Sequence, residues 1–336
     1  MAEPLLQIRN LKISIQLGEE RGYPVNDISY DLFENETLGV VGESGSGKSL
    51  HILALLGLLP RGLAVESGEI LFAGRDLLKM GAKELRNVRG NEIGVVFQDP
   101  MTSLNPVLTI GRQISEVLVR HKRLNWASAR SKGKELLELV GIPDAERRMR
   151  NYPFQFSGGM RQRVMIAIAL ACEPRLLIAD EATTALDVTI QAQVIDLIRS
   201  LKERFGMSIV WITHDIGVVA GFADTVQVMY AGQIMERGPV RSVFYNTANA
   251  YTWSLMKSLP RPDQAANEAL YQIPGQPPNP FRLAKGDPFA ERNPFATERC
   301  FQERPPLRSV GDVDGHDVAA WYDLKTRIEE IKGRTS

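Results

Sequence analysis

The sequence predicts an α/β domain built on a mostly parallel sheet, with an antiparallel β flank, a helical insertion and a Pro-rich C-terminal appendage. Three observations predict this class. Short, continuously apolar segments alternate with helix-like segments, as in parallel sheets that are covered on both faces. A Gly-rich loop lies between one apolar segment and a helix-like segment. Between about residues 109 and 141, apolar residues recur at helical spacing in the middle of the strand pattern.

The composition excludes several classes of protein. The 336 residues suffice for one large domain with an appendage, and 40 Lys and Arg balance 40 Asp and Glu, which gives no basic field for nucleic acid. Two cysteines argue against a disulfide framework and fit a reducing compartment. Residues 1–4 lack the blocks of a signal peptide, and no apolar run approaches the roughly 18 residues that span a bilayer. We therefore expect a cytosolic chain whose membrane role comes through partners.

The elements of the first hundred residues follow from β-branched runs, turn residues and helical spacing. They are, in order, strand 5–17, turn 18–24, strand 25–32, strand 37–41, the Gly-rich loop 42–49, helix 51–56, loop 62–68, strand 69–72, helix 82–88 and strand 93–97, which stops at Gln98.

The remaining elements follow from the same signals. They are a turn-rich segment 99–106, the helical insertion, helix 164–171, strand 175–181, helix 190–204, strands 208–213, 225–230 and 233–236, helix 253–257, an irregular tract 260–306 and helix 320–332. We predict one domain over residues 1–250, with a helical subdomain at about 99–172, and a C-terminal extension over 251–336. Ile114, Val117 and Leu118 form an apolar stripe in the insertion, which is more typical of core than of a partner surface.

The Gly-rich loop fits the pattern of four arbitrary residues between glycines, followed by Gly-Lys-Ser. Its members are Gly42, Glu43, Ser44, Gly45, Ser46, Gly47, Lys48 and Ser49. The glycines let successive backbone N–H groups point into one concavity, and the helix N-terminus adds positive potential. Lys48 supplies a charge for the β- and γ-phosphates, and Ser49 supplies a hydroxyl for Mg²⁺. We expect the chain to bind a nucleoside triphosphate.

Three predicted strand ends carry the other groups that a triphosphate site requires. Asp180 closes an apolar strand, where a carboxylate can order Mg²⁺, and Glu181 follows it, where it can accept a proton from the attacking water. Gln98 ends another strand, and its amide could coordinate Mg²⁺ or water. His214 ends a third strand, where its imidazole can bond a γ-phosphate oxygen. Glu181, His214, Gln98 and Lys48 are therefore the predicted catalytic groups, and Ser49, Gln98 and Asp180 the predicted Mg²⁺ ligands.

A second phosphate-binding nest is predicted at Ser157, Gly158 and Gly159, which open a helix with a hydroxyl and free N–H groups. One domain does not need two γ-phosphate sites. The sequence therefore favours two domains that share each nucleotide.

With these motifs in this order, the sequence resembles the nucleotide-binding subunit of an ATP-binding cassette (ABC) transporter over roughly residues 5 to 322, a P-loop NTPase fold. The resemblance implies ATP and Mg²⁺ as cofactors. It assigns Walker A to 42–49, the Q-loop to Gln98, Walker B and the catalytic carboxylate to Asp180 and Glu181, the D-loop to Ala185, Leu186 and Asp187, and the switch histidine to His214. The signature is assigned to 156–160, and the resemblance implies that its Ser157, Gly158, Gly159 and Met160 cover the ATP of a partner subunit.

The sequence departs from this family at three places. The signature reads Phe-Ser-Gly-Gly-Met where Leu-Ser-Gly-Gly-Gln is usual, so we expect function with altered packing. Ala182 replaces the usual proline after the catalytic Glu, which removes a φ restraint without abolishing hydrolysis. The aromatic residue that stacks on adenine in this family is missing from residues 15–17, and Tyr23 is the candidate for that role.

Residues 98–106 and 250–275 resemble a narrower subfamily, the ATPases of dipeptide, oligopeptide and nickel importers, and among them the dipeptide-importer type. This implies an importer at the cytoplasmic face of the bacterial inner membrane. Its partners would be a second ABC ATPase, which is usually a paralogue and gives a heterodimer, two transmembrane permeases and an extracytoplasmic solute-binding protein, with no nucleic acid. Many members carry four cysteines for an iron–sulfur cluster. Their counterparts here are Asp287, Asn293, Cys300 and Ala320, so we expect no iron–sulfur cluster.

Two alternatives remain open from the motifs alone. One is a non-transport cassette ATPase that acts on ribosomes or DNA, which usually has two cassettes or long coiled-coil insertions that this sequence lacks. The other is an ABC exporter ATPase, which residues 98–106 disfavour.

Overall fold

The computed structural model describes residues 3–184, 187–259, 271–311, 313 and 315–335. The chain forms two compact units, and each is assembled from segments that lie far apart in sequence. Unit 1 comprises Met1–Leu5, Leu32–Thr37 and Lys79–Thr213, and unit 2 comprises Leu6–Asp31, Leu38–Leu78 and His214–Ser336. The C-terminal extension predicted from residue 251 thus belongs to the same unit as the Gly-rich loop. The domain boundary at residue 250 stays a prediction.

Unit 1 contains three neighbouring parallel strands in the order β8-β7-β6, which are continuously apolar and largely buried, as predicted. Its elements are α2 (Ala82–Val88), β6 (Ile93–Val96), α3 (Pro100–Ser103), α4 (Ile110–Lys122), α5 (Trp126–Leu139), α6 (Ala145–Arg148), a 3₁₀ turn (Pro153–Gln155), α7 (Gly158–Leu170), β7 (Leu176–Asp180), α8 (Val188–Phe205) and β8 (Ser208–Thr213).

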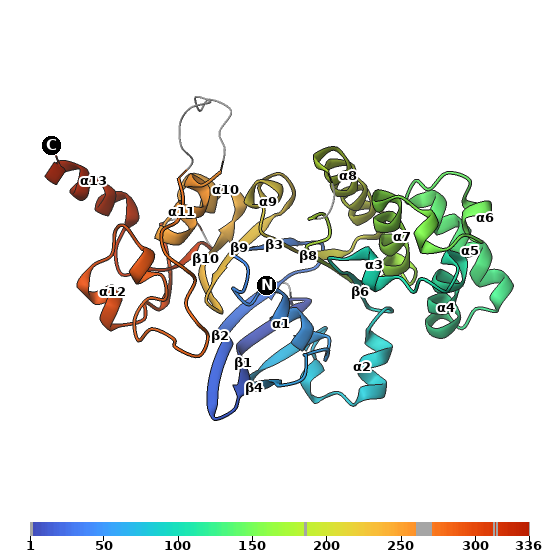
Figure 1. Ribbon diagram of the computed structural model, residues 1–336, viewed down its shortest axis with the longest axis horizontal. Coiled ribbons are helices and arrows are strands. Elements are labelled where there is room, and N and C mark those ends of the chain that lie inside the picture. The colour runs from blue at the N-terminus through green and yellow to red at the C-terminus, as the bar shows by residue number, and fades with distance from the viewer. Residues whose placement is uncertain (1–2, 185–186, 260–270, 312, 314, 336) are drawn as a thin grey trace. The chain divides into compact units, whose positions relative to one another are not determined.

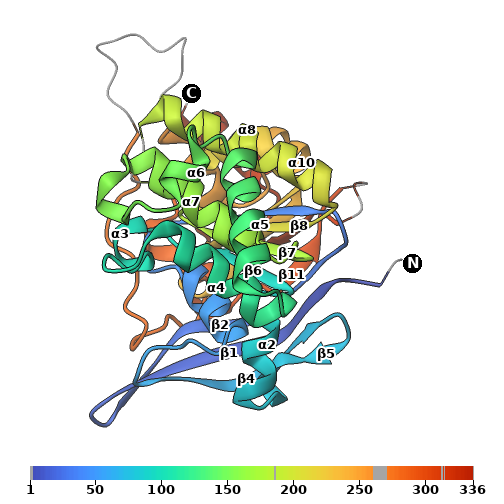
Figure 2. The same cartoon turned by 90° about the vertical axis from the view of Figure 1, so that its right-hand side faces the viewer.

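The predicted helical insertion consists of several helices, and α4 to α7 lie together in both views (Figures 1 and 2). Arg123 ends α4 with a left-handed backbone (φ 54°), so the helical pattern breaks there before α5 begins. Ile114 and Leu118 of the apolar stripe are buried, whereas Val117 is half-buried. The prediction that this stripe belongs to the core is therefore confirmed for Ile114 and Leu118.

Unit 2 contains two sheets, in the orders β2-β1-β4-β5 and β11-β12-β10-β9-β3. Its strands are β1 (Leu6–Leu17), β2 (Glu20–Leu32), β3 (Thr37–Val41), β4 (Leu63–Phe72), β5 (Arg75–Asp76), β9 (Thr225–Tyr230), β10 (Gln233–Pro239), β11 (Leu307–Ser309) and β12 (Asp317–Ala319). Its helices are α1 (Lys48–Leu55), α9 (Ile216–Phe222), α10 (Val240–Tyr245), α11 (Ala250–Lys257), α12 (Glu298–Gln302) and α13 (Leu324–Thr335), with 3₁₀ turns at Leu77–Lys79 and Ala290–Arg292.

The predicted loop over 62–68 is wrong from residue 63 onward, because residues 63–68 form the first half of β4, which pairs antiparallel with β1. The misleading residue is Gly68, which has a φ of 107° and lies where the pairing register shifts. A Cβ on Gly68 would lie 2.6 Å from Leu11 Cα. The glycine therefore permits a bulged strand to approach its neighbour, and it does not mark a loop. The predicted turn over 18–24 is also too long, since β2 already begins at Glu20.

The second sheet of unit 2 combines parallel and antiparallel pairing. β3 and β9 are parallel, as predicted for the main sheet, while β10, β11 and β12 pair antiparallel. The sequence did not predict β11 and β12, because three-residue strands are too short to show an alternating pattern. They place the C-terminal extension against the edge of β10 (Figure 1).

No helix within the described ranges is both long enough and apolar enough to cross a membrane.

Candidate functional site

The Gly-rich loop joins β3 to α1, and its backbone requires glycine at defined positions. Gly42, Gly45 and Gly47 have φ values of 153°, 79° and 93°. A Cβ on Gly42 would lie 2.1 Å from the carbonyl oxygen of Met229, and one on Gly47 would lie 2.5 Å from that of Pro24. Gly47 is the N-cap of α1 and makes no side-chain cap, and the backbone N–H groups at a helix start are the donors that bind anions.

The ammonium of Lys48 is hydrogen-bonded to the backbone of the loop. Lys48 is only 4% exposed, and its Nζ donates to the carbonyl oxygens of Gly42 (2.8 Å) and Glu43 (2.9 Å). His51, one turn further along α1, adds no charge near neutral pH, because burial lowers its pKa to about 4. The ammonium of Lys48 is thus the charge that α1 places at the loop.

Glu43 has two partners that the sequence analysis missed. Its backbone N–H donates to the hydroxyl of Tyr251 (2.8 Å), and its carboxylate accepts two hydrogen bonds from Arg292 (2.7 and 3.0 Å). These partners lie 208 and 249 residues away in the chain. Arg292 lies in a Pro-rich tract without periodicity, so no local pattern could have found it.

In unit 1, the ends of two strands bring Gln98 and Glu181 together. β6 and β7 are parallel neighbours, so their carboxyl ends lie at the same edge, where open α/β sheets bind ligands. Gln98 Nε2 donates to Glu181 Oε2 (3.0 Å), and Thr184 Oγ1 donates to the same oxygen (3.4 Å). Asp180 precedes Glu181 and is half-buried at the end of β7. The structure thus places one amide and two carboxylates at this edge.

The backbone at Glu181 is strained. Its φ is +49°, a region that non-glycine residues rarely adopt, and its N–H donates to the carbonyl oxygen of Ile212 (2.9 Å). Strain of this kind collects at functional sites, where the surrounding structure holds a side chain in a chosen direction.

The signature segment begins α7. Ser157 is the N-cap, and its Oγ accepts a hydrogen bond from the N–H of Met160 (3.4 Å). Gly158 is exposed, whereas a Cβ on Gly159 would lie 2.9 Å from Ile190 Cγ2. Phe156, which replaces the usual leucine, is buried, with the guanidinium of Arg148 5.4 Å from the centre of its ring. The altered residue therefore points into the core, and the cap remains intact.

The other predicted site residues lie in turns and at helix starts. Asp187 caps α8 by accepting from the N–H of Ile190 (2.9 Å), while Ala185 and Leu186 of the predicted D-loop lie outside the described residues. His214 directly follows β8 and is exposed.

Tyr23 lies on β2, where Lys12 Nζ stands 4.0 Å from the centre of its ring. A cation thus covers one face of this ring. The predicted stacking of Tyr23 on adenine stays a prediction.

The four positions matched to cluster cysteines are buried and belong to polar or packing contacts. Asp287 accepts from the N–H of Phe289 (2.9 Å), Asn293 donates to the hydroxyl of Tyr322 (2.7 Å), and Cys300 Sγ lies 3.4 Å from Thr297 Oγ1. Ala320 is buried. Within the part of the chain that the structure describes, no group of three or more His, Cys, Asp or Glu could hold a metal ion.

Known proteins resemble the chain over most of its length. The family model for the ABC transporter matches residues 25–184, and the model for the oligopeptide/dipeptide transporter C-terminal region matches residues 235–300. The oligopeptide transport ATP-binding protein OppD of Bacillus subtilis is 49% identical over 318 residues, which cover 94% of this chain and 88% of the relative. The dipeptide transport ATP-binding protein DppD of Lactococcus lactis is 48% identical over 320 residues, which cover 95% of this chain and 91% of the relative.

Among solved structures, the ATP-binding cassette MJ0796 in its dimeric post-hydrolysis state with ADP and Pi is similar, with a TM-score of 0.63 and 28% identity. This match covers 70% of our chain and 99% of that chain.

Proposed function

This chain belongs to the ABC transporter family, among the oligopeptide and dipeptide transport ATP-binding proteins, and from that membership we propose that it hydrolyses ATP to drive the uptake of peptides. The observation that carries this proposal is the match beyond the cassette. Residues 235–300 match a C-terminal region specific to oligopeptide and dipeptide transporters, which favours an importer over an exporter or a ribosome- or DNA-directed ATPase.

The nucleotide would be bound through the loop of unit 2. Its backbone N–H groups and the start of α1 would receive the phosphates, with Lys48 on the β- and γ-phosphates. The side chains of Ser49, Asp180 and Gln98 offer oxygen atoms, the donors that Mg²⁺ prefers, so their chemistry fits this ion. When bound, Mg²⁺ would neutralise charge on the phosphates.

Glu181 would act as the general base that accepts a proton from the attacking water. The hydrogen bond from Gln98 and the strained backbone at Glu181 support this assignment, since both restrict the direction of the carboxylate. His214 and Lys48 would stabilise the charge that spreads over the transferred phosphoryl group. Tyr23 would stack on the adenine through the ring face opposite Lys12.

The signature residues Ser157 to Met160 would cover an ATP bound to a second ABC ATPase, with Asp187 in the adjoining D-loop. We propose a paralogue as this second subunit, two membrane permeases as the proteins that both ATPases drive, and an extracytoplasmic solute-binding protein that delivers the peptide. The chain would then work at the cytoplasmic face of the inner membrane, with residues 251–336 as its C-terminal extension.

Peptide uptake in the source organism tests the function. A strain that lacks this gene should take up a radiolabelled tripeptide more slowly than its parent, and the wild-type gene should restore uptake. A gene with Glu181→Gln should fail to restore it, because general-base catalysis contributes about 10²–10⁴-fold to rate. Glu203→Gln, an exposed carboxylate on α8, is the matched control.

Two results would contradict the proposal. Undiminished tripeptide uptake in the deletion strain would contradict the peptide-import function. A transcript measurement checks that no related importer is expressed in that strain. Full ATP turnover by the Glu181→Gln protein in isolated membranes would remove the assignment of Glu181 as the base.

A further inference from the structure

The carboxylate of Glu43 is held by an arginine from the far end of the chain. Arg292 Nη1 donates to Glu43 Oε2 (2.7 Å) and Nη2 donates to Oε1 (3.0 Å), a bidentate pair. The side chain of Arg292 is 7% exposed and that of Glu43 is 23% exposed. Solvent therefore screens this pair much less than it screens an ion pair on the surface.

The guanidinium of Arg292 is fixed on its other sides as well. Nε donates to the carbonyl oxygen of Pro274 (2.7 Å), and Nη1 also donates to the hydroxyl of Tyr230 (3.0 Å). The guanidinium carbon lies 5.6 Å from the centre of the Tyr230 ring and 5.9 Å from that of Phe289. Burial opposes its charge, but the hydrogen bonds to Glu43 and Tyr230 outweigh burial and raise the pKa of Arg292. The arginine is thus charged and has one defined orientation.

The backbone of Glu43 is held by a second residue of the C-terminal extension (residues 251–336), Tyr251. Its N–H donates to the hydroxyl of Tyr251 (2.8 Å), and the Tyr251 ring packs against the rings of Tyr230 (4.5 Å between centres) and Phe289 (5.2 Å). Burial raises the pKa of Tyr251, so its hydroxyl stays neutral. Glu43 is thus held at both its side chain and its backbone.

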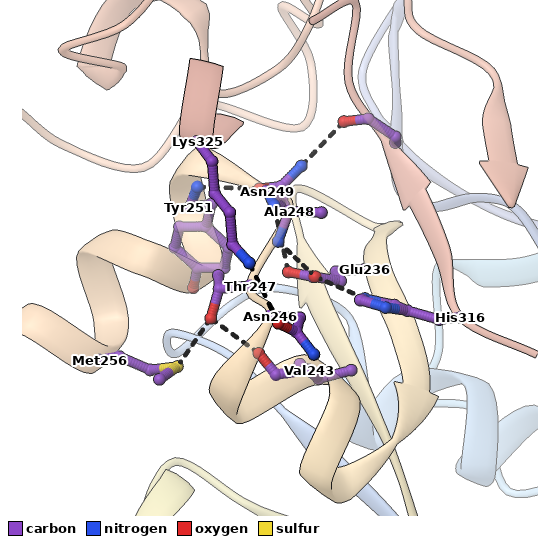
Figure 3. A network of polar contacts seen from close by, with 11 residues as sticks. Glu236, Val243, Asn246, Thr247, Ala248, Asn249, Tyr251, Met256, His316 and Lys325 are labelled. Atoms are coloured by element: carbon purple, nitrogen blue, oxygen red, sulfur yellow. Dashed lines mark hydrogen bonds and ion pairs between the residues drawn. The ribbon is translucent and has the colours of Figure 1, made fainter. Parts of the chain in front are cut away.

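Tyr251 is in turn fixed by a buried polar network (Figure 3). Asn249 caps α11 by accepting from the N–H of Tyr251 (2.8 Å), and its side-chain amide donates to the carbonyl oxygen of Ala319 (2.8 Å). The carboxylate of Glu236 accepts from the N–H groups of Ala248 (2.8 Å) and Asn249 (3.2 Å), and His316 Nε2 lies 2.9 Å from it. The network therefore connects β10, the start of α11 and β12 to the residue that contacts the loop.

The charge of Glu43 makes these contacts relevant to binding. The loop would receive a polyphosphate, and a carboxylate without a partner there would repel it. The ammonium of Lys48 is directed elsewhere, because it donates to the carbonyl oxygens of Gly42 and Glu43. Arg292 neutralises the carboxylate and keeps it turned toward the C-terminal segment.

We propose that Arg292 and Tyr251 are positioning residues for nucleotide binding. Arg292 keeps the Glu43 carboxylate neutralised and turned toward residues 251–336, and Tyr251 holds the phosphate loop through the backbone N–H of Glu43. This inference rests on the proposed function of the loop. According to this inference, residues 251–336 contribute to ATP binding at the phosphate loop of their own chain.

Calorimetric titration of the purified full-length chain with ATP and Mg²⁺ tests this inference. We expect Arg292→Ala to raise the dissociation constant for ATP about tenfold, within the range typical of coupling between sites, and Arg292→Lys to recover part of the loss. Tyr251→Phe keeps the ring and removes the hydroxyl, so we expect a rise of about fivefold. Arg299→Ala is the control, because this exposed arginine of α12 pairs with Glu303, the C-cap residue of the same helix.

The second arm separates charge neutralisation from a folding defect. Adding Glu43→Gln to Arg292→Ala removes the unpaired charge and leaves the space vacated by the arginine side chain empty. If the charge causes the loss, ATP binding should return to within about threefold of wild type. In ATPase measurements, Arg292→Ala should raise KM for ATP and leave kcat unchanged, since it weakens binding of substrate and transition state alike. Wild-type ATP affinity of Arg292→Ala, or failure of Glu43→Gln to rescue it, would overturn the inference.

Lys48→Ala distinguishes this inference from the proposed function. If Lys48→Ala loses ATP binding and Arg292→Ala does not, only the inference about the C-terminal segment fails. If Lys48→Ala binds ATP like the wild type, the assignment of the phosphate loop fails and the inference fails with it.

Discussion

The phosphate loop of unit 2 and the strand ends of unit 1 hold their polar groups by different means. The loop is fixed mainly through its backbone, by glycines with positive φ that pack against the carbonyl oxygens of Met229 and Pro24 and by the hydrogen bond from the Glu43 N–H to Tyr251, with the Glu43 carboxylate also held by Arg292. At the strand ends, the exposed side chains of Gln98 and Thr184 donate hydrogen bonds to the Glu181 carboxylate, and the Glu181 N–H donates to the carbonyl oxygen of Ile212.

The difference matches the work that we propose for each region. A loop that binds phosphates through its N–H groups must have its geometry before the ligand arrives, because ordering a backbone on binding weakens affinity. A general base must meet a water molecule whose position depends on the bound nucleotide, and exposed hydrogen bonds exchange easily with water. We therefore expect substitutions in the loop to change stability and affinity, and substitutions at the strand ends to change turnover.

The largest effect should come from Gly42→Ala. A Cβ at this position would lie 2.1 Å from the carbonyl oxygen of Met229, and φ is 153°. Strain and overpacking together should lower the free energy of unfolding by about 3–5 kcal/mol and abolish ATP binding. Gly45→Ala is the matched control, since its Cβ would meet no atom within 4 Å and only its φ of 79° is unfavourable. It should cost about 1 kcal/mol in urea denaturation, and equal losses in the two variants would contradict the role of packing.

Asp287→Asn should give the next largest effect, and this effect should depend on pH. Burial raises the pKa of Asp287 to about 6 from its ordinary value of 3.8. The folded chain therefore binds this proton more tightly than the unfolded chain does, so the contribution to stability is complete below pH 3.8 and is lost as pH rises through about 6.

Asparagine keeps an oxygen for the N–H of Phe289 and has no charge to bury. At pH 7 the Asp287→Asn variant should be more stable than wild type by up to about 3 kcal/mol, and near pH 4 this advantage should vanish. Denaturant titrations of both proteins at the two pH values measure it. An advantage that does not change with pH would show that the charge of Asp287 is not its origin.

Gln98→Ala should have a smaller effect, on turnover and not on stability. It removes the hydrogen bond to Glu181 Oε2, and an exposed hydrogen bond to a charged group contributes about 1.5 kcal/mol, or roughly tenfold. We expect kcat for ATP hydrolysis to fall about tenfold while the melting temperature stays within about 1 °C. A shift of several degrees would show that Gln98 supports the fold of unit 1.

Thr184→Ala should have the smallest effect. The hydrogen bond from Thr184 Oγ1 to Glu181 is long (3.4 Å) and exposed, so its loss should change kcat by less than about twofold. A tenfold loss would mean that the two hydrogen bonds on Glu181 are equally important, and the strand ends would then resemble the loop more closely than we infer.

The sequence predicted the elements whose signal is local. Strands β8 and β9 and helix α2 have the predicted bounds, because a continuous apolar run or a short polar segment between turns defines them. It missed the first half of β4, where a glycine permits a bulge, and the three-residue strands β11 and β12, which exist only because β10 offers an edge.

Part of the candidate site followed from the same reasoning. The ends of adjacent parallel strands meet, so the contact between Gln98 and Glu181 could be anticipated from the strand pattern. Nothing in the sequence near Glu43 indicates Arg292, and nothing near Arg292 indicates Glu43.

The sequence by itself predicted the phosphate loop, because the access of glycine to positive φ and the backbone donors of a helix start are local properties of the chain. Only the tertiary structure decided what holds that loop. The ion pair and hydrogen bond on Glu43 join residues 249 and 208 positions apart, and their partners are brought to the loop by the packing of Tyr251 and Phe289 against Tyr230 of β9. Such pairings depend on distance in space, which a periodic pattern along the chain does not record.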